Sequence, residues 1–193
     1  MNEEVKIWQG GVAIDDRGCL SFCNDFNFEG VKRFYMVENF DHNFVRAWHG
    51  HKEEGKYVTV VSGAALIALI DLRGIKDWGS IERIRGCIQY SANEAEVKKK
   101  WQDFGMYKSE DDPGYTEEDA LAVYNVPIQK ITCSARKPTV VWIPPGFING
   151  AMNLDDDTRI LYFSTKGLGE SEGDDYRFEW NTWGADFWDI DYR

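Results

Sequence analysis

The chain has 193 residues, of which 43% are hydrophobic and 15% are aromatic, with eight tryptophans. This composition is typical of one globular domain with a packed core, and it excludes an intrinsically disordered chain. The formal net charge is −11. Such a charge argues against a nucleic-acid-binding protein, because affinity for the phosphate backbone requires clustered Lys and Arg.

The chain also lacks the sequence features of an exported or membrane protein. Its first residues, MNEEVKIWQGG, are acidic where a signal peptide is basic, and no stretch reaches the ~18 consecutive apolar residues of a membrane span. The cysteines, Cys19, Cys23, Cys87 and Cys133, include no CxxC pair, so we expect neither a disulfide framework nor a zinc ribbon. We therefore expect a cytoplasmic protein that contacts no membrane.

Most of the hydrophobic patterning is of the β type. Apolar runs predict strands at 57–61, 64–70, 131–133, 139–143 and 159–164. Ser62-Gly63 separates the first two runs, which predicts two antiparallel strands around a tight turn. Several short strands between Gly and Pro residues predict an all-β sandwich or barrel.

The segment between the second and third of these strands has a helical pattern instead. Residues 91–100, SANEAEVKKK, begin with Ser and carry acidic residues early and lysines late. This order complements the dipole of a helix and predicts one. Residues 109–119, SEDDPGYTEED, are acidic and turn-rich and predict a solvated loop, followed by a short helical or extended piece around 120–124.

Two of the three histidines lie two positions apart, in Arg46-Ala-Trp-His49-Gly-His51-Lys-Glu-Glu-Gly-Lys56. Residues i and i+2 of a strand face the same side, so both imidazoles can point into one cavity. The alternative interpretation is a pair of surface histidines, because short motifs often occur by chance.

This stretch and the later segment Pro144-Pro-Gly-Phe-Ile-Asn-Gly-Ala-Met-Asn153 resemble the two-motif signature of the cupin superfamily. The resemblance implies an all-β, antiparallel jelly-roll barrel with its site inside. Metal-binding cupins use both histidines, a later acidic residue and a second-motif histidine, but Lys56 and Asn149 hold the last two places here. An ammonium group repels a divalent cation, so we expect no metal. Glu53 or Glu54 could act as a ligand only in a different strand register.

Among metal-free cupins, the chain resembles the nucleotide-sugar 3,5-epimerases, the family that includes dTDP-4-dehydrorhamnose 3,5-epimerase. The resemblance covers about 10–75 and 128–180. It rests on Asp15-Asp-Arg17-Gly18, Val45-Arg-Ala-Trp-His49, Gly55-Lys-Tyr-Val-Thr-Val-Val-Ser-Gly63, Ile70-Asp-Leu-Arg73, Trp142-Ile-Pro-Pro-Gly-Phe147 and Leu161-Tyr162. It implies a single cupin domain over 1–193, with a partly helical insertion at about 75–127. It also implies a homodimer that uses no cofactor.

The resemblance implies a role for each site residue. His49 falls on the catalytic base, Tyr162 on the acid at the opposite face of the sugar, and Lys56 on the lysine beside the developing enolate. The substrate-binding positions are Arg17 and Arg46, at the nucleotide diphosphate, and Asn39, His51 and Asn149. Tryptophans are more often core residues than platforms for a ligand; the alternative is that Trp48, or one of Trp180, Trp183 and Trp188, stacks on the nucleobase.

Three positions depart from the family pattern. Asn149 replaces a histidine, Ile67 replaces an inward-facing acidic residue, and the C-terminal Asp that orients the catalytic histidine has no clear counterpart. The order Arg-x-x-His-x-His-Lys is also similar to that of nucleotide-sugar 3,4-ketoisomerases, which move a ketone through an enediol. We expect epimerisation at C3, C5 or both of a 4-keto-6-deoxy nucleotide sugar in polysaccharide biosynthesis. A 3,4-ketoisomerase and a non-catalytic sugar-nucleotide-binding cupin are the alternatives.

Overall fold

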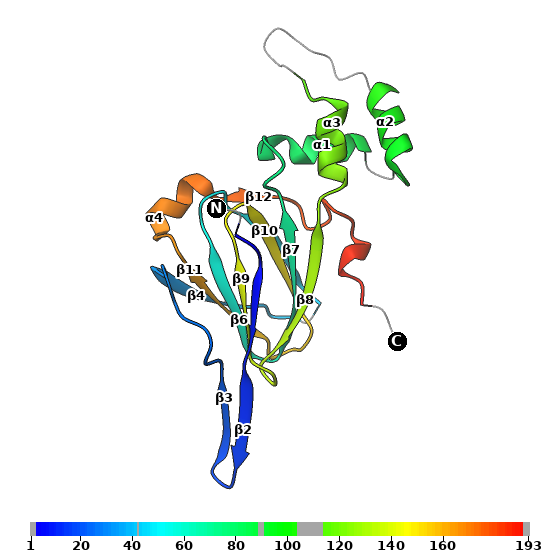
Figure 1. Cartoon of the computed structure of the whole chain (residues 1–193). Coiled ribbons are helices and arrows are strands. Elements are labelled where there is room, and N and C mark those ends of the chain that lie inside the picture. The colour runs from blue at the N-terminus through cyan, green and yellow to red at the C-terminus, as the bar shows by residue number, and fades with distance from the viewer. Residues whose placement is uncertain (1–2, 42, 89–90, 104–113, 191–193) are drawn as a thin grey trace.

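The computed structural model describes residues 3–41, 43–88, 91–103 and 114–190 and contains two five-stranded antiparallel sheets packed face to face (Figure 1). The first sheet has the order β1 (Lys6–Gln9), β9 (Thr139–Ile143), β6 (Lys56–Ser62), β11 (Arg159–Ser164) and β4 (Arg33–Glu38). The second has the order β12 (Tyr176–Arg177), β5 (Val45–Gly50), β10 (Phe147–Asn153), β7 (Ala64–Asp71) and β8 (Ile128–Ser134). The predicted all-β jelly-roll architecture is confirmed.

The five strands predicted from apolar runs are β6, β7, β8, β9 and β11. The predicted hairpin between the first two is wrong, because β6 pairs with β9 and β11 whereas β7 pairs with β8 and β10. Gly63, with φ of +64°, carries the chain from one sheet to the other. A Cβ there would lie 2.7 Å from Thr158 Oγ1, so the crossing needs glycine for its space as well as its backbone angle.

A separate hairpin, β2 (Gly11–Asp15) and β3 (Gly18–Phe22), projects away from the two sheets (Figure 1). Its side chains are almost all exposed. The sequence did not predict this hairpin, because β2 and β3 bury no continuous apolar face.

The space between the two sheets is filled at its centre by inward-facing apolar side chains. They are Val58, Val60, Ala65, Ile67, Leu69, Cys133, Val141, Ile143, Phe147, Ala151, Ile160 and Tyr162. Ile67, which stands where the resembling family has an acidic residue, is part of this apolar core.

The segment between β7 and β8 is helical, with η1 (Trp78–Ser80), α1 (Ile81–Ile88), α2 (Glu94–Asp103) and α3 (Glu117–Tyr124). The predicted helix at 91–100 is therefore confirmed, but it begins later. Asn93 Oδ1 accepts a hydrogen bond from the Glu96 amide at 3.0 Å, so Asn93 and not Ser91 caps it. The sequence missed α1, which is short.

The predicted loop at 109–119 is wrong at its end. Thr116 and Asp119 form a capping box, and Glu117 begins α3. Acidic residues favour the first turn of a helix as much as they favour a solvated loop, which is why the composition did not separate the two. Residues 109–113 lie outside the described part of the chain.

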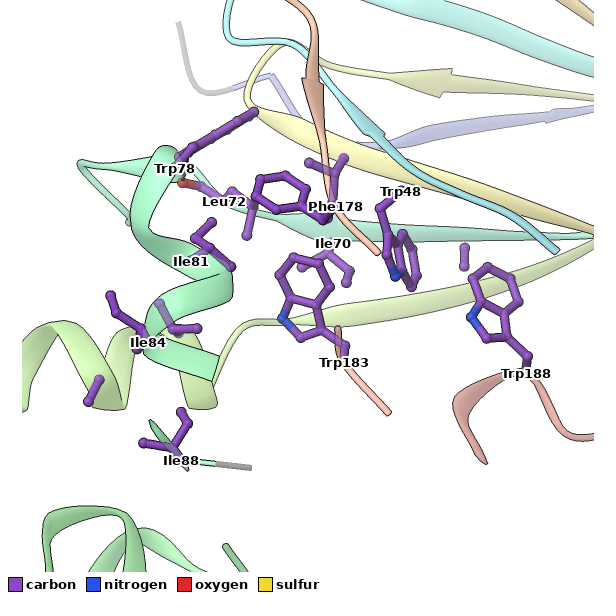
Figure 2. Packing of buried hydrophobic residues seen from close by; sticks show 14 of the residues in the cluster. Trp48, Ile70, Leu72, Trp78, Ile81, Ile84, Ile88, Phe178, Trp183 and Trp188 are labelled. Atoms are coloured by element: carbon purple, nitrogen blue, oxygen red, sulfur yellow. Dashed lines mark hydrogen bonds between the residues drawn. The ribbon is translucent and has the colours of Figure 1, made fainter. Parts of the chain in front are cut away.

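A second apolar cluster covers the outer face of the second sheet, between that sheet, the helices and the C-terminal segment (Figure 2). Trp48 has no exposed surface, and its ring centroid lies 4.9 Å from Trp188 and 5.7 Å from Trp183. The carbonyl of Trp180 accepts hydrogen bonds from the indoles of Trp48 and Trp188. Trp48, Trp183 and Trp188 are therefore core residues and not platforms for a nucleobase.

Gly150 of β10 allows this cluster to pack against the sheet. A Cβ at Gly150 would lie 2.5 Å from Ala47 Cβ and 2.8 Å from the ring of Trp188. The C-terminal segment also contains α4 (Leu168–Ser171), η2 (Glu172–Asp174) and η3 (Asp186–Trp188). Within the described residues, no helix is long and apolar enough to cross a membrane.

Candidate active site

A cavity of about 480 Å³ opens between the two sheets, beside α4 and the segment that leads to β12. Six of the eight residues predicted from the sequence line it: Arg46, His49, His51, Lys56, Asn149 and Tyr162. They come from both sheets, so the two sheets together build the candidate site.

A β-bulge places two of these residues on the same wall. Asn149 of β10 pairs with His49 of β5, and Ala151 of β10 pairs with Arg46 of β5. The two pairs are thus two residues apart on β10 but three residues apart on β5. The extra residue in β5 changes the alternation of side chains. Arg46 and His49 therefore both line the cavity, while Trp48 between them packs into the outer core.

Two predicted residues do not line the cavity. Arg17 lies at the turn of the β2–β3 hairpin, where its side chain is 86% exposed and pairs with Asp15. Asn39 is buried and donates a hydrogen bond to Asn153 Oδ1 at 3.2 Å. Asn153 lies four residues along β10 from the cavity residue Asn149.

His49 is a neutral imidazole in this environment. Burial lowers its pKa to about 4, and the nearby cations Arg177 and Lys56 contribute, while the Asp175 carboxylate opposes them. The side-chain amide of Asn149 donates a hydrogen bond to the backbone carbonyl of His49 at 2.9 Å. A neutral imidazole can accept a proton from a substrate without first losing one.

Lys56 begins β6 and points into the same cavity. Burial lowers the pKa of its ammonium group, and the charge of Glu54 opposes this effect. Lys56 Nζ lies 3.7 Å from Glu54 Oε1. A cation held in a partly dry cavity stabilises a developing negative charge more strongly than a cation in water does.

Tyr162 faces the cavity from β11, and its ring stacks on that of Tyr35, with centroids 5.1 Å apart and planes 6° from parallel. Burial raises the pKa of both phenols; the charge of Glu54 adds to this effect for Tyr35. Both hydroxyl groups are therefore protonated near neutral pH and can donate a proton or a hydrogen bond.

The sequence did not identify several residues that line the cavity: Arg33, Tyr35, Ser171, Asp175 and Arg177. Arg33 and Tyr35 are on β4, whose half-buried positions alternate with exposed ones. Because exposed positions of β4 hold Phe34 and Met36, the sequence shows no alternation of polar and apolar residues that could have identified the inward-facing side chains. Burial alone would raise the pKa of Asp175, but hydrogen bonds from Arg177 lower it. Asp175 is the carboxylate whose charge acts on His49, although no C-terminal acid was predicted to do so.

The charged neighbours of Glu53 and Glu54 do not suit a metal site. Glu53 pairs with Lys166 at 3.1 Å, and Glu54 pairs with Lys56 and Arg33. In the described part of the chain, no three His, Cys, Asp or Glu side chains form a group that could hold a metal ion. The cations beside Glu53 and Glu54 would repel a divalent metal ion, which argues against either carboxylate as a ligand in place of Lys56.

No protein-family model and no curated protein matches the chain. Solved structures do resemble it. dTDP-4-dehydrorhamnose 3,5-epimerase from Bacillus anthracis, with TDP and PPi bound, is 16% identical with a TM-score of 0.57, over 92% of this chain and 80% of that chain. ChmJ, a 3'-monoepimerase from Streptomyces bikiniensis in complex with dTDP-quinovose, is 14% identical with a TM-score of 0.56, over 91% and 69% of the two chains.

The sugar 3,4-ketoisomerase QdtA from Thermoanaerobacterium thermosaccharolyticum, in complex with TDP, is 15% identical with a TM-score of 0.52, over 97% of this chain and 93% of that chain. The chain therefore has the cupin-like fold of these nucleotide-sugar epimerases and ketoisomerases. This likeness concerns the fold alone.

Proposed function

We propose that the chain is an isomerase of nucleotide-linked sugars that moves a proton next to a sugar ketone. The observation that supports this most is the grouping of His49, Lys56 and Tyr162 around one cavity. A neutral imidazole, an ammonium group and a protonated phenol are the base, the enolate-stabilising cation and the acid that this chemistry needs.

The proposed substrate is a 4-keto-6-deoxy nucleotide sugar, of the dTDP-linked type. His49 removes a proton from C3 or C5, and the electrons of the broken C–H bond move to the ketone oxygen, which Lys56 stabilises as an enolate. Tyr162 then returns a proton to the same carbon from the opposite face, which inverts its configuration. Arg46 binds the diphosphate, since a guanidinium group forms paired hydrogen bonds with phosphate oxygens.

A 3,4-ketoisomerase is the second candidate, because both histidines of the HxH pair line the cavity. In that reaction the two imidazoles would first move a proton from C3 to the oxygen at C4, which gives an enediol. They would then move a proton from the oxygen at C3 to C4, which leaves the ketone at C3 and a hydroxyl group at C4. The similarity to QdtA extends over nearly the whole of both chains, which supports this candidate. A cupin that binds a sugar nucleotide without turnover is the third.

Incubation of the protein with a 4-keto nucleotide sugar in D2O tests these candidates. We expect solvent deuterium at C3, C5 or both by NMR, with the ketone still at C4. A carbonyl that appears at C3 would instead establish the ketoisomerase. Binding without any exchange would leave the non-catalytic candidate.

Two variants and a control connect the reaction to the cavity. His49→Asn should abolish exchange, and Tyr162→Phe should reduce inversion by ~10²-fold or more while some exchange remains. Tyr57→Phe is the matched control, because Tyr57 packs against Trp142 outside the cavity and its hydroxyl group donates to the Glu29 carbonyl. It should leave the rate unchanged.

We also propose that the protein is a cytoplasmic homodimer. The role of Arg17 depends on this proposal, because Arg17 does not line the cavity of its own chain. If it binds the diphosphate, it does so in the cavity of a second copy. Light scattering measures the dimer, and Arg17→Ala should then weaken nucleotide binding only where the dimer forms.

A further inference from the structure

Glu54 lies beside the cavity and its side chain has no exposed surface. Its two oxygens have different partners. Oε1 lies 3.4 Å from Arg33 Nη2 and 3.7 Å from Lys56 Nζ. Oε2 accepts a hydrogen bond from Ser171 Oγ and lies 3.5 Å from His51 Nδ1. Side chains from β4, β6, α4 and the turn after β5 therefore meet at one carboxylate.

This carboxylate is ionised. Burial by itself would raise the pKa of Glu54, but the charge of Lys56 and the hydrogen bonds from Ser171 and Ser164 outweigh burial and lower it. A buried charge without partners would be costly, whereas this one has partners at both oxygens. Glu54 is thus a fixed negative charge on the cavity wall.

His51 is the neighbour on which this charge has a chemical effect. Its Nδ1 atom is buried and has no hydrogen-bond partner within the described residues, and Glu54 Oε2 faces it at slightly more than hydrogen-bonding length. Burial and then Lys56 lower the pKa of His51, while Glu54, Asp174 and Asp175 oppose them. In the neutral ring, a carboxylate beside Nδ1 favours the proton on Nδ1 and leaves Nε2 as the acceptor.

His49 lies in a different electrostatic environment. Two of the charges that act on it most strongly, Arg177 and Lys56, are cations, and Asp175 is itself engaged by Arg177 at 2.8 Å. An imidazolium formed at His51 would face a dedicated carboxylate, whereas one formed at His49 would face mainly cations.

We propose that Glu54 is a positioning residue: it holds His51 as the Nδ1–H tautomer and makes His51 Nε2 a second proton acceptor of the site. This inference rests on the proposed function only for the identity of the substrate. When Nε2 takes a proton from the substrate, Glu54 stays ionised and stabilises the imidazolium, which later returns that proton. Ser171 and Arg33 hold the carboxylate in place.

NMR of the 15N-labelled protein without substrate tests the tautomer. Long-range 1H–15N spectra near neutral pH distinguish a protonated from an unprotonated ring nitrogen, and the signal lost in His51→Asn identifies His51. We expect the Nδ1–H form in the unaltered protein. Glu54→Gln should shift His51 toward the Nε2–H form and lower its pKa further, because a charge that raises this pKa is removed.

Glu53→Gln is the matched control: it makes the same chemical change one residue away, on a side chain that is 73% exposed, and should leave His51 unchanged. The Nε2–H form in the unaltered protein would overturn the proposal, and so would an unchanged tautomer in Glu54→Gln. If Glu54→Gln does not fold, the spectrum of the unaltered protein still decides.

Turnover separates this proposal from the proposed function. With an active substrate, Glu54→Gln should lower kcat by ~10²-fold with little change in KM, since it acts on proton transfer and not on the diphosphate. If the Nδ1–H tautomer is found but no 4-keto nucleotide sugar exchanges deuterium, the positioning role stands and the proposed function fails. If turnover is found with the other tautomer, the positioning role alone fails.

Discussion

Protonation of His49 should destabilise the folded protein at acid pH, and His49→Asn should remove that effect. The pKa of His49 is about 4 in the folded state, against about 6.5 in an unfolded chain. Between these two values the unfolded chain binds more protons than the folded protein, so stability falls as the pH falls. Each pKa unit corresponds to about 1.4 kcal/mol, and His49 should therefore cost about 2 kcal/mol between pH 7 and 4.5, after allowance for its partial exposure.

Urea denaturation of the unaltered protein and of the His49→Asn variant, each at pH 7 and at pH 4.5, measures this cost. Other groups also titrate between these pH values, and they do so in both proteins. The informative quantity is therefore the loss of unfolding free energy in the unaltered protein minus the loss in His49→Asn. His49→Asn should lose about 2 kcal/mol less than the unaltered protein. Arg177→Gln should lose an intermediate amount, because one of the cations that lower the pKa of His49 is removed. Equal losses in all three proteins would refute the view that burial and neighbouring cations keep His49 neutral.

Arg46→Ala should weaken the binding of a nucleoside diphosphate by about 2–3 kcal/mol in a calorimetric titration, and an unchanged affinity would place the diphosphate elsewhere. Elemental analysis of the purified protein should find no stoichiometric transition metal, and EDTA should leave any turnover intact, because Lys56 stands where a ligand would be needed. Gly150→Ala should lower the free energy of unfolding by about 1–3 kcal/mol through overpacking, measured in urea. Gly86→Ala, where a Cβ meets nothing within 4 Å, is the control and should not destabilise.

The strands that the sequence predicted are those with a continuous apolar run. β7 and β9 are buried along almost their whole length, so hydrophobicity alone identified them. The partner of each strand could not be predicted in the same way. Ser62-Gly63 is as compatible with a hairpin as with a crossing between sheets, and only the packing of the two sheets decides between them.

The candidate site was predicted where its residues are close in the sequence. The HxH spacing placed both imidazoles at one cavity, but the β-bulge that brings Arg46 beside them depends on the pairing of β5 with β10. The partners of Glu54 could not be predicted either. Arg33 lies 21 residues before it and Ser171 lies 117 residues after it, and nothing local in the sequence signals such contacts.

The turn that contains His51 is stabilised by hydrogen bonds to Asp174, which lies far from it in the sequence. The Asp174 carboxylate accepts hydrogen bonds from the amides of Lys52 and Glu53, more than 120 residues earlier, and Phe178 exchanges backbone hydrogen bonds with Trp48. During synthesis, which proceeds from the N-terminus, β5 is made early but must wait for these partners. The cavity can therefore close only after residues 174–178 have been made, and until then the face of β5 that carries Trp48 lacks its backbone partner Phe178.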